Sequence, residues 1–255
     1  MWEAIGEPND PQALTIRADC MEILPTLRNN SIDMVLCDMP YGTTRNKWDS
    51  VLPLDQLFSE YERITTENAA ILLFSQQPFT SELVQAEKRL FRYEIIWQKP
   101  NATGFLNAQR MPLKAHENIL VFYKHLPEYH PIKRYGFAPA KALRKHEGST
   151  NYRKFNKDSV YISDGSRYPI DVLIFKHERG LHPTQKPTPL CEYLIKTYTS
   201  EGATVLDNCM GSGTTGVAAI ECKRRFLGIE LDQKYYETAR SRINEAVNKP
   251  RLLVV

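Results

Sequence analysis

The chain carries one motif whose residue types suit chemistry on a nucleic-acid base: Asp38-Met39-Pro40-Tyr41, directly after the largely apolar run 32–37. The run is predicted to be a strand, and ligands of open α/β sheets gather at the carboxyl ends of strands. Asp38 and the backbone carbonyl of Met39 could accept both hydrogens of an exocyclic amine and so free its lone pair, while Tyr41 stacks on the base. The base would first have to leave the duplex. An ordinary turn at a strand end remains the alternative.

A glycine-rich loop predicts a cofactor site. Gly211, Gly213 and Gly216 satisfy the pattern G-x-G-x-x-G between a predicted strand and a predicted helix. Glycines let a backbone approach a ligand closely, and Glu230, at the end of the next predicted strand, could accept hydrogen bonds from both hydroxyls of a ribose. Together they predict a cofactor that contains adenosine, without separating NAD from S-adenosylmethionine. A tight turn without a ligand is the simpler interpretation.

Asp207 helps to choose between these cofactors. It ends the predicted strand that leads into the glycine loop. A carboxylate at this place would repel a pyrophosphate, whereas it suits the ammonium group of a methionine moiety. Asp207 therefore favours S-adenosylmethionine.

Strand and helix patterns alternate along most of the chain, which predicts a mostly parallel sheet of about seven strands with helices on both faces. Strands are predicted at 15–18, 32–37, 69–75, 93–97, 118–123, 203–208 and 226–230, and helices at 21–30, 54–64, 78–90, 214–222 and 233–247.

Residues 126–181 break this alternation and are predicted to be an irregular insertion. They hold 11 Lys/Arg against 6 Asp/Glu, so they are more basic than the whole chain, whose net charge is +3. Aromatic residues interleave with the basic ones, a combination suited to phosphate contact and base stacking. We therefore expect a catalytic and cofactor-binding domain of residues 1–125 and 182–255, interrupted by a target-recognition region at 126–181. A merely solvated insertion is the alternative.

Composition excludes several other classes of protein. No run of about 18 apolar residues is present, so no membrane span is expected. The 5 cysteines form no CxxC pair and no zinc-like cluster with histidine. We expect reduced thiols, no metal and a cytoplasmic location, and the N-terminal residues lack the pattern of a signal peptide.

Five motifs in a fixed order resemble those of the S-adenosylmethionine-dependent DNA amino-methyltransferases, in particular the permuted, or β, group of the adenine-N6 type. DMPY is similar to that family's D-P-P-Y motif, and Asp19 matches the acid before the catalytic strand. The other matching segments are HPTQKP (182–187), LDNCMGSGTT (206–215) and FLGIELDQKYYETA (226–239). The resemblance implies a Rossmann-like methyltransferase fold in which the catalytic half precedes the cofactor loop.

The resemblance also implies roles for individual residues. Asp38, Met39, Pro40 and Tyr41 would form the catalytic motif. S-adenosylmethionine would be held by Asp19, Cys20, Thr184, Lys186, Asp207, Gly211, Ser212, Gly213, Thr214 and Glu230, with Thr184 and Lys186 at the methionine carboxylate. His182 is expected to be structural. Arg45 and Lys47, in the polar loop after Tyr41, and Arg153, Lys154 and Lys157, in the basic insertion, are the candidates for DNA contact.

Two departures from the family pattern leave the catalytic atoms in place. Met39 replaces a proline and keeps its carbonyl, and Asn208-Cys209 replaces Pro-Phe, which questions the packing under the cofactor. Cytosine N4 methylation remains an alternative, with an NAD-dependent oxidoreductase and a non-catalytic DNA-binding module as remoter ones. The expected partner is double-stranded DNA, in a bacterial or phage-encoded protein. A homodimer and a companion endonuclease stay open.

Overall fold

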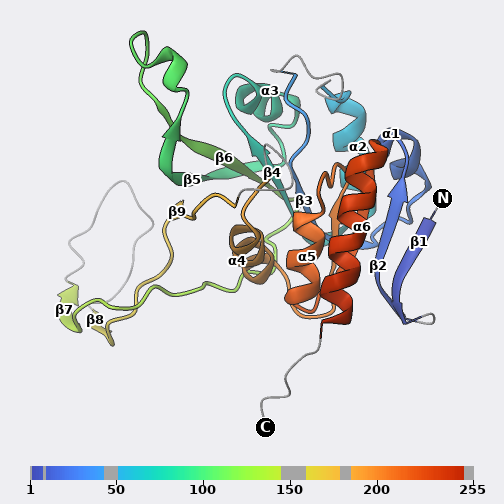
Figure 1. Cartoon of the computed structure of the whole chain (residues 1–255). Helices are drawn as coiled ribbons and strands as arrows, with labels where there is room; N and C mark the ends of the chain where they lie inside the picture. Colours follow the sequence, from blue (N-terminus) through green and yellow to red (C-terminus); the bar gives the residue numbers. More distant parts are fainter. Residues whose placement is uncertain (1, 8–9, 43–50, 145–158, 179–184, 250–255) are drawn as a thin grey trace. The chain divides into compact units, whose positions relative to one another are not determined.

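The computed structural model describes residues 2–7, 10–42, 51–144, 159–178 and 185–249 (Figure 1). These residues form two compact units, one of residues 1–130 and 171–255 and a smaller one of residues 131–170. The larger unit contains the sheet and its helices.

A nine-stranded sheet organises the larger unit, in the order β1-β2-β11-β10-β3-β4-β6-β5-β9. The five neighbouring strands from β2 to β4 all run parallel, whereas β1 and β6 pair antiparallel with their neighbours. The strands are β1 (Trp2–Glu7), β2 (Asp10–Arg17), β3 (Ile32–Cys37), β4 (Thr65–Ser75), β5 (Phe91–Thr103), β6 (Lys114–Phe122), β9 (Val172–Ile174), β10 (Thr204–Asp207) and β11 (Arg225–Glu230).

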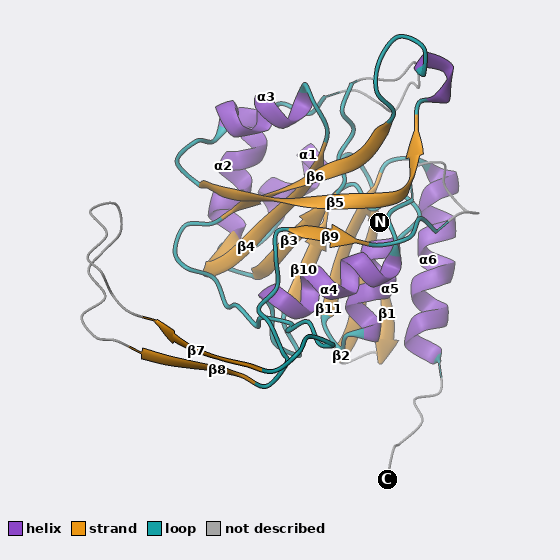
Figure 2. Cartoon of the chain, turned by 90° about the vertical axis from the view of Figure 1, so that its left-hand side faces the viewer, coloured by secondary structure: helices purple, strands orange, loops and turns teal. Residues whose placement is uncertain are grey.

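Helices cover both faces of this sheet (Figure 2). One face carries α1 (Cys20–Ile23), the 3-10 turn η1 (Leu24–Thr26), α2 (Leu54–Ile64) and α3 (Phe79–Ala86). The other carries α4 (Thr188–Tyr198), α5 (Thr214–Glu221) and α6 (Gln233–Asn248). The predicted α/β fold with helices on both faces is confirmed.

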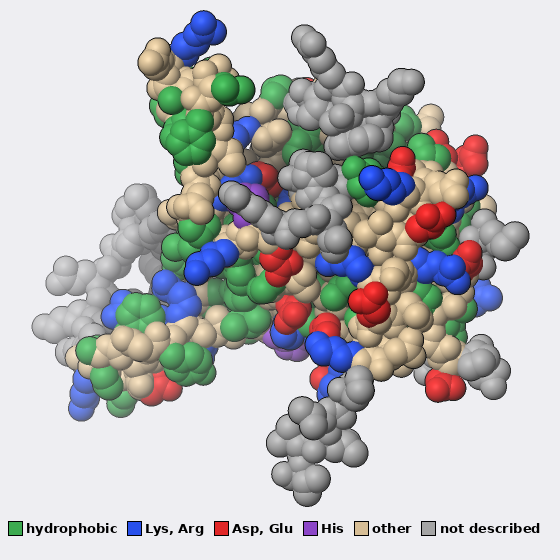
Figure 3. Space-filling view, in the orientation of Figure 1, with side chains coloured by type: hydrophobic (Ala, Val, Ile, Leu, Met, Phe, Trp, Pro, Cys, Tyr) green, Lys and Arg blue, Asp and Glu red, His purple; other side chains and the backbone are tan. Residues whose placement is uncertain are grey.

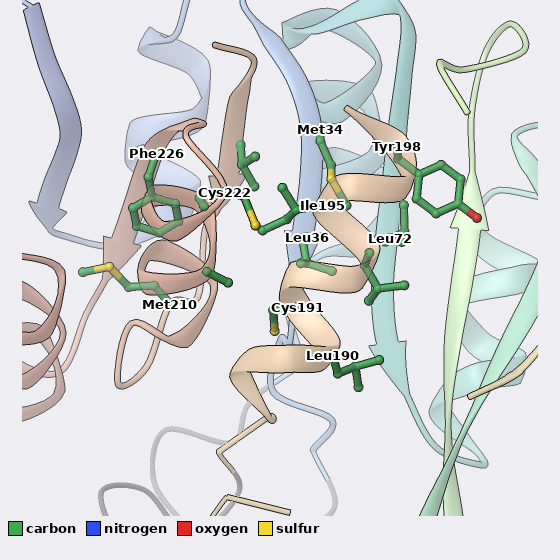
Figure 4. Close-up of a cluster of buried hydrophobic side chains, with 14 of the residues drawn as sticks. Met34, Leu36, Leu72, Leu190, Cys191, Ile195, Tyr198, Met210, Cys222 and Phe226 are labelled. Carbon is green, nitrogen blue, oxygen red and sulfur yellow. The ribbon is translucent and has the colours of Figure 1, made fainter. Parts of the chain in front are cut away.

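The apolar character of β3 follows from its burial on both faces. Met34 and Leu36 point into the core under α4 and α5, as Figure 4 shows, while Val35 and Cys37 point into the core under α2. Successive side chains of a strand alternate between faces, so a central strand needs apolar residues at nearly every position. This double burial makes the end of β3 a rigid place for a functional residue.

Two predictions about elements are wrong. The helix predicted at 21–30 ends at Ile23 and continues as η1, because Pro25 has no amide hydrogen to extend an α-helix. The count of about seven strands missed the short β1 and β9 at the two edges of the sheet. Helix α4 was not predicted; its Pro189 lies in the first turn, where proline is tolerated.

The smaller unit, residues 131–170, is not irregular throughout. It holds a two-stranded antiparallel sheet of β7 (Ala140–Arg144) and β8 (Ser159–Ser163). The guanidinium groups of Arg134 and Arg167 lie 5.3 and 4.4 Å from the ring centre of Phe137. Within the described ranges of the chain, no helix combines the length and the apolar character that a membrane span requires.

Candidate active site

Four carboxylates meet at one edge of the sheet. Asp19 follows β2, Glu230 ends β11, Asp207 ends β10 and Asp38 follows β3. These four strands are parallel neighbours, so their carboxyl ends lie side by side. All four residues line one cavity of about 780 Å³. The sheet therefore brings together acids that are separated by more than 200 positions in the sequence.

The glycine loop between β10 and α5 forms one wall of the cavity. Gly211 and Gly213 both have positive φ, at 51° and 78°. A Cβ on Gly213 would lie 2.8 Å from Cβ of Ala239 on α6, so only glycine lets the loop pack this closely. A Cβ on Gly211 would meet nothing within 4 Å. Gly211 thus keeps a side of the cavity open, whereas Gly213 does not line the cavity and instead shapes the turn.

Arg242 of α6 donates hydrogen bonds to the same loop. This residue was not predicted from the sequence. Its Nη1 donates to the carbonyl of Ser212 at 2.5 Å and lies 3.3 Å from Oγ1 of Thr214. The signal in the sequence is weak, because an arginine in an amphipathic helix is usually solvated.

Glu230 is fixed by the backbone of the loops beside it. Its Oε2 accepts a hydrogen bond from the amide of Gly211 and its Oε1 from that of Asp232, both at 2.8 Å. Burial raises the pKa of this carboxyl above its ordinary value, although the two amides act against that rise. Each carboxylate oxygen keeps a further lone pair for a ligand hydroxyl.

Asp207 is a carboxyl whose protonation is poised near neutrality. It is 3% exposed, and burial raises its pKa to about 7. The amide of Cys209 donates to its Oδ1 at 3.1 Å, which favours the ionised form, while the nearby negative charge of Asp38 disfavours it. No described lysine or arginine forms an ion pair with Asp207 within 4 Å in the regions that the structure covers. A cation entering the cavity would stabilise its ionised form.

Asp38 is held by two partners at the end of β3. Tyr41 donates its hydroxyl to Oδ1 at 2.6 Å, and the ammonium of Lys186 lies 2.5 Å from Oδ2. The ring of Tyr41 is stacked on Phe79, with ring centres 5.3 Å apart. Asp38 is therefore oriented before any substrate binds, and one face of Tyr41 is already covered.

Lys186 belongs to a chain of buried charges that continues to Glu117 and Lys99. Its ammonium lies 3.3 Å from Oε2 of Glu117, whose other oxygen pairs with Lys99. Burial alone would lower the pKa of Lys186, but the carboxylates of Asp38 and Glu117 raise it above its ordinary value. Burial would likewise raise the pKa of Glu117, and the two lysines bring it below its ordinary value. Lys186 and Glu117 thus each favour the ionised form of the other.

Glu117 and Lys99 also line the cavity, although the sequence analysis did not single them out. Glu117 lies in the polar first half of β6, and Lys99 lies in β5, many of whose residues are exposed. Charged residues in such strands are ordinary, so the sequence carried no signal for these two.

Asn208 and Cys209, which stand where the family pattern has Pro-Phe, both line the cavity and contact the residues beneath it. The amide oxygen of Asn208 accepts a hydrogen bond from the hydroxyl of Tyr61 at 2.6 Å. The Nδ2 of Asn208 donates to Sγ of Cys209 at 3.7 Å, and Cys209 packs against the core on the α2 face. The side chain of Met39 is likewise 2% exposed and packs into the core on the α2 face.

Most of the predicted site residues that the structure describes line this single cavity. They are Asp19, Cys20, Asp38, Met39, Pro40, Tyr41, Lys186, Asp207, Gly211, Ser212, Thr214 and Glu230. Other predictions fall outside the described residues, namely those for Arg45, Lys47, Arg153, Lys154, Lys157, His182 and Thr184.

A comparison with models of protein families shows which family this chain belongs to. The family model described as DNA methylase matches residues 32–241, a span that includes both Asp38 and Glu230. The chain belongs to the DNA methylase family. The family covers methylation of adenine N6 and of cytosine N4, so membership does not select the base. The predicted DNA methyltransferase family is confirmed, and the oxidoreductase alternative finds no support.

Relatives and solved structures agree with this assignment. The methylase is 27% identical to the type II methyltransferase M2.DpnII of Streptococcus pneumoniae over 94% of this chain and 92% of that protein. It is 27% identical to M.HpaI of Haemophilus parainfluenzae over 91% of this chain and 74% of that protein. Both relatives are bacterial.

The fold is shared with two solved methyltransferases. The complex of M1.HpyAVI with SAM has a TM-score of 0.62 at 24% identity, over 91% of this chain and 99% of that one. The PvuII DNA methyltransferase, described as cytosine-N4-specific, has a TM-score of 0.61 at 14% identity, over 93% of each chain. The predicted Rossmann-like methyltransferase fold is therefore confirmed.

Proposed function

We propose that this methylase transfers a methyl group from S-adenosylmethionine to the exocyclic N6 amine of adenine in double-stranded DNA. The observation that carries the proposal is the place of Asp38, which is held at the end of β3 in the same cavity as the glycine loop and Glu230. An acceptor for a base amine and a cradle for a nucleoside cofactor thus share one space.

The cofactor is S-adenosylmethionine, and the chemistry of the cavity fits it. Glu230 offers acceptors to ribose hydroxyls, and Gly211 leaves room for close approach. Asp207 is a buried carboxyl without a cationic partner among the described residues, as a site for the cofactor's ammonium group requires. The solved M1.HpyAVI complex, in which a protein of the same fold holds SAM, adds support. When bound, the cofactor supplies a methyl group on a sulfonium.

Asp38 would then act on the target amine directly. Its two oxygens already accept from Tyr41 and Lys186, but each retains a lone pair. Asp38 and the carbonyl of Met39 would take the two amine hydrogens and make the nitrogen lone pair available. The charge of Asp38 would stabilise the positive charge that develops on nitrogen when it accepts the methyl group.

Lys186 would hold Asp38 in place for this step through its contact with Oδ2. Its ammonium contacts Asp38 and Glu117, which leaves one of its three hydrogens for the methionine carboxylate that the sequence analysis assigned to it. Thr184, the other residue assigned to that carboxylate, lies outside the described residues.

The choice of adenine rests on the aspartate that leads the catalytic motif. In the family that the sequence resembles, aspartate usually leads this motif in adenine enzymes and serine in cytosine enzymes. Asp38 occupies that place. Cytosine N4 is the second candidate, since the PvuII enzyme of that specificity shares the fold.

We further propose that DNA is recognised by the basic insertion 126–181, with Arg153, Lys154 and Lys157 at phosphates, and by Arg45 and Lys47. The excess of Lys/Arg and the interleaved aromatic residues of the insertion support this. A protein that modifies bacterial DNA works in the cytoplasm, and the bacterial relatives fit that location. A homodimer and a companion endonuclease remain predictions.

Analysis of nucleosides tests the proposal. Mixed-sequence duplex DNA is incubated with the protein and S-adenosylmethionine, digested to nucleosides and separated by mass spectrometry. N6-methyldeoxyadenosine is the expected main product. N4-methyldeoxycytidine as the main product would overturn the choice of base, and the absence of any methylated nucleoside, with folded protein and bound cofactor, would overturn DNA as the substrate.

A further inference from the structure

The hairpin that joins β5 to β6 ends in an exposed apolar tip that the chemistry proposed above does not use. The side chains of Phe105, Leu106 and Met111 are 70%, 101% and 58% exposed. Every residue from 103 to 112 is exposed. A single exposed apolar residue is ordinary, but three within seven positions of one loop mark a surface that meets another molecule.

The tip is shaped by its own backbone. The amide of Asn107 donates to the carbonyl of Gly104 at 2.9 Å, and that of Met111 to the carbonyl of Asn107 at 3.0 Å. Gly104 has a φ of 90°, a left-handed conformation that turns the chain into the short 3-10 helix η2 (Phe105–Asn107). The hairpin extends beyond the body of the sheet, in green in Figure 1. Its apolar side chains are thus presented outward rather than folded back.

The base of this hairpin is part of the rim of the active-site cavity. Thr103 and Lys114 are partners in the register of β5 and β6, and both line the cavity. Leu106 lies three positions after Thr103, so it is at most on the order of 10 Å from the rim, the reach of fully extended chain. The tip therefore stands beside the opening that leads to Asp38 and Tyr41.

The charge around the tip suits a polyanion. The largely exposed segment around the tip, residues 103–116, contains Arg110 and Lys114 and neither Asp nor Glu. Figure 3 shows apolar and basic side chains together at the end of this hairpin. Proteins that insert apolar side chains between stacked bases combine them with basic residues that contact the phosphates.

We propose that this tip is a wedge for duplex DNA, in which Leu106 and Phe105 enter the base step that the target nucleotide leaves. The inference rests on the proposed function, because a base that reacts in the cavity has to leave the stack. Its departure opens a gap in the duplex beside the cavity, and apolar side chains that fill the gap replace the lost stacking. The same base-independent wedge would serve adenine or cytosine.

The wedge is tested with the double variant Phe105→Ala/Leu106→Ala and two duplexes. Both duplexes carry the methylation site found by sequencing modified bases, and in one of them the target lies opposite an abasic nucleotide, so that it is already unpaired. We expect the variant to lose about tenfold to a hundredfold in kcat/KM on the paired duplex, because the opened step is no longer filled. On the abasic duplex it should stay within about threefold of the wild type, since less opening is required.

Two further variants control for the chemistry of the tip. Gln109→Ala removes a polar side chain from the same loop and should leave both rates unchanged, whereas Leu106→Met keeps an apolar point and should retain most of the activity on paired DNA. Unchanged cofactor affinity and melting temperature would show that the double variant is folded, as expected for exposed side chains.

Other outcomes overturn the wedge. An equal loss on both duplexes would place the tip in another step, and no loss on either would remove its role. Conversion of a dimer to a monomer by the double variant, measured by sedimentation, would make the tip an interface between copies of the chain. Failure of the proposed function looks different, because the wild type would then methylate neither duplex.

Discussion

At the scale of residues, the carboxyl groups of the active site differ in the partners that surround them. Asp38 is paired with Lys186, Glu230 is held by two backbone amides, and Asp207 has no cationic partner among the described residues. Opposite charges and amide hydrogens favour the ionised form of a carboxyl, whereas burial favours the neutral form. At one edge of the sheet, Asp38 therefore has a cationic partner within the chain, whereas Asp207 has none among the described residues.

The state of Asp207 predicts that cofactor affinity depends on pH. Burial raises its pKa from 3.8 to about 7, so in the free protein it is mostly protonated at pH 6 and mostly ionised at pH 7.5. Under the proposal that Asp207 holds the cofactor's ammonium, binding requires the ionised form, so at low pH the proton must leave first. We expect affinity to be roughly eightfold weaker at pH 6 than at pH 7.5, measured by calorimetry.

Asp207→Asn is the control for this dependence. The variant cannot ionise, so it should bind more weakly at pH 7.5 and show little change between the two pH values. A wild-type affinity that is flat across this range would remove Asp207 from the cofactor's ammonium.

At the scale of elements, helices and strands could be predicted where the pattern of apolar residues within the segment itself determines them. The helix at 54–64 and the strand at 32–37 have the predicted bounds, because amphipathic spacing and double burial are visible in single segments. The edge strands β1 and β9 were missed, since a short edge strand lacks a strong apolar pattern. The motif residues of the site could be named in advance. The ion pairs of Lys186 with Glu117 could not, because they join segments that only the folded sheet brings together.

The close packing of the glycine loop against α6 gives a prediction at this scale. Gly213→Ala would place a methyl group 2.8 Å from Cβ of Ala239 and would hold alanine at a φ of 78°. Gly202→Ala is a matched control, because Gly202 has a φ of 85° but nothing lies within 4 Å of its Cβ position. We expect the control to lose about 1–2 kcal/mol in free energy of unfolding from backbone strain alone.

Gly213→Ala should lose clearly more than this control and should also weaken cofactor binding, since the loop must shift. Denaturant titration measures the first effect and calorimetry the second. Equal losses of stability in the two variants would mean that the contact with Ala239 does not constrain the loop.

At the scale of the whole molecule, the chain places its excess of positive charge in the insertion between the catalytic motif and the cofactor loop. The insertion 126–181 holds 11 of the 33 Lys/Arg residues but 6 of the 30 Asp/Glu residues. A protein that neutralises DNA phosphates with such groups releases counterions, and this release becomes less favourable as the salt concentration rises. The DNA affinity of this methylase should therefore fall steeply with ionic strength.

Replacing Arg153, Lys154 and Lys157 together by alanine should reduce the slope of log affinity against log salt by about 2.7, if each contacts one phosphate of B-DNA. Cofactor affinity should not change. A control triple of lysines, Lys196, Lys223 and Lys249, pairs with glutamates in the structure and should leave the slope unaltered when replaced. Equal slopes for the wild type and the first variant would direct the search to another DNA surface.

The central claim is that Asp38 drives methyl transfer to an amine of a DNA base, and a single-turnover assay tests it most directly. Duplex DNA is mixed with excess protein and S-adenosylmethionine carrying a labelled methyl group, and label in DNA is followed over time for the wild type and Asp38→Ala. The account predicts labelled DNA with the wild type and a rate lower by about 10²–10³ or more in the variant, with cofactor binding retained, because the variant lacks the charge that stabilises the developing cation. A near-normal rate of Asp38→Ala would contradict it.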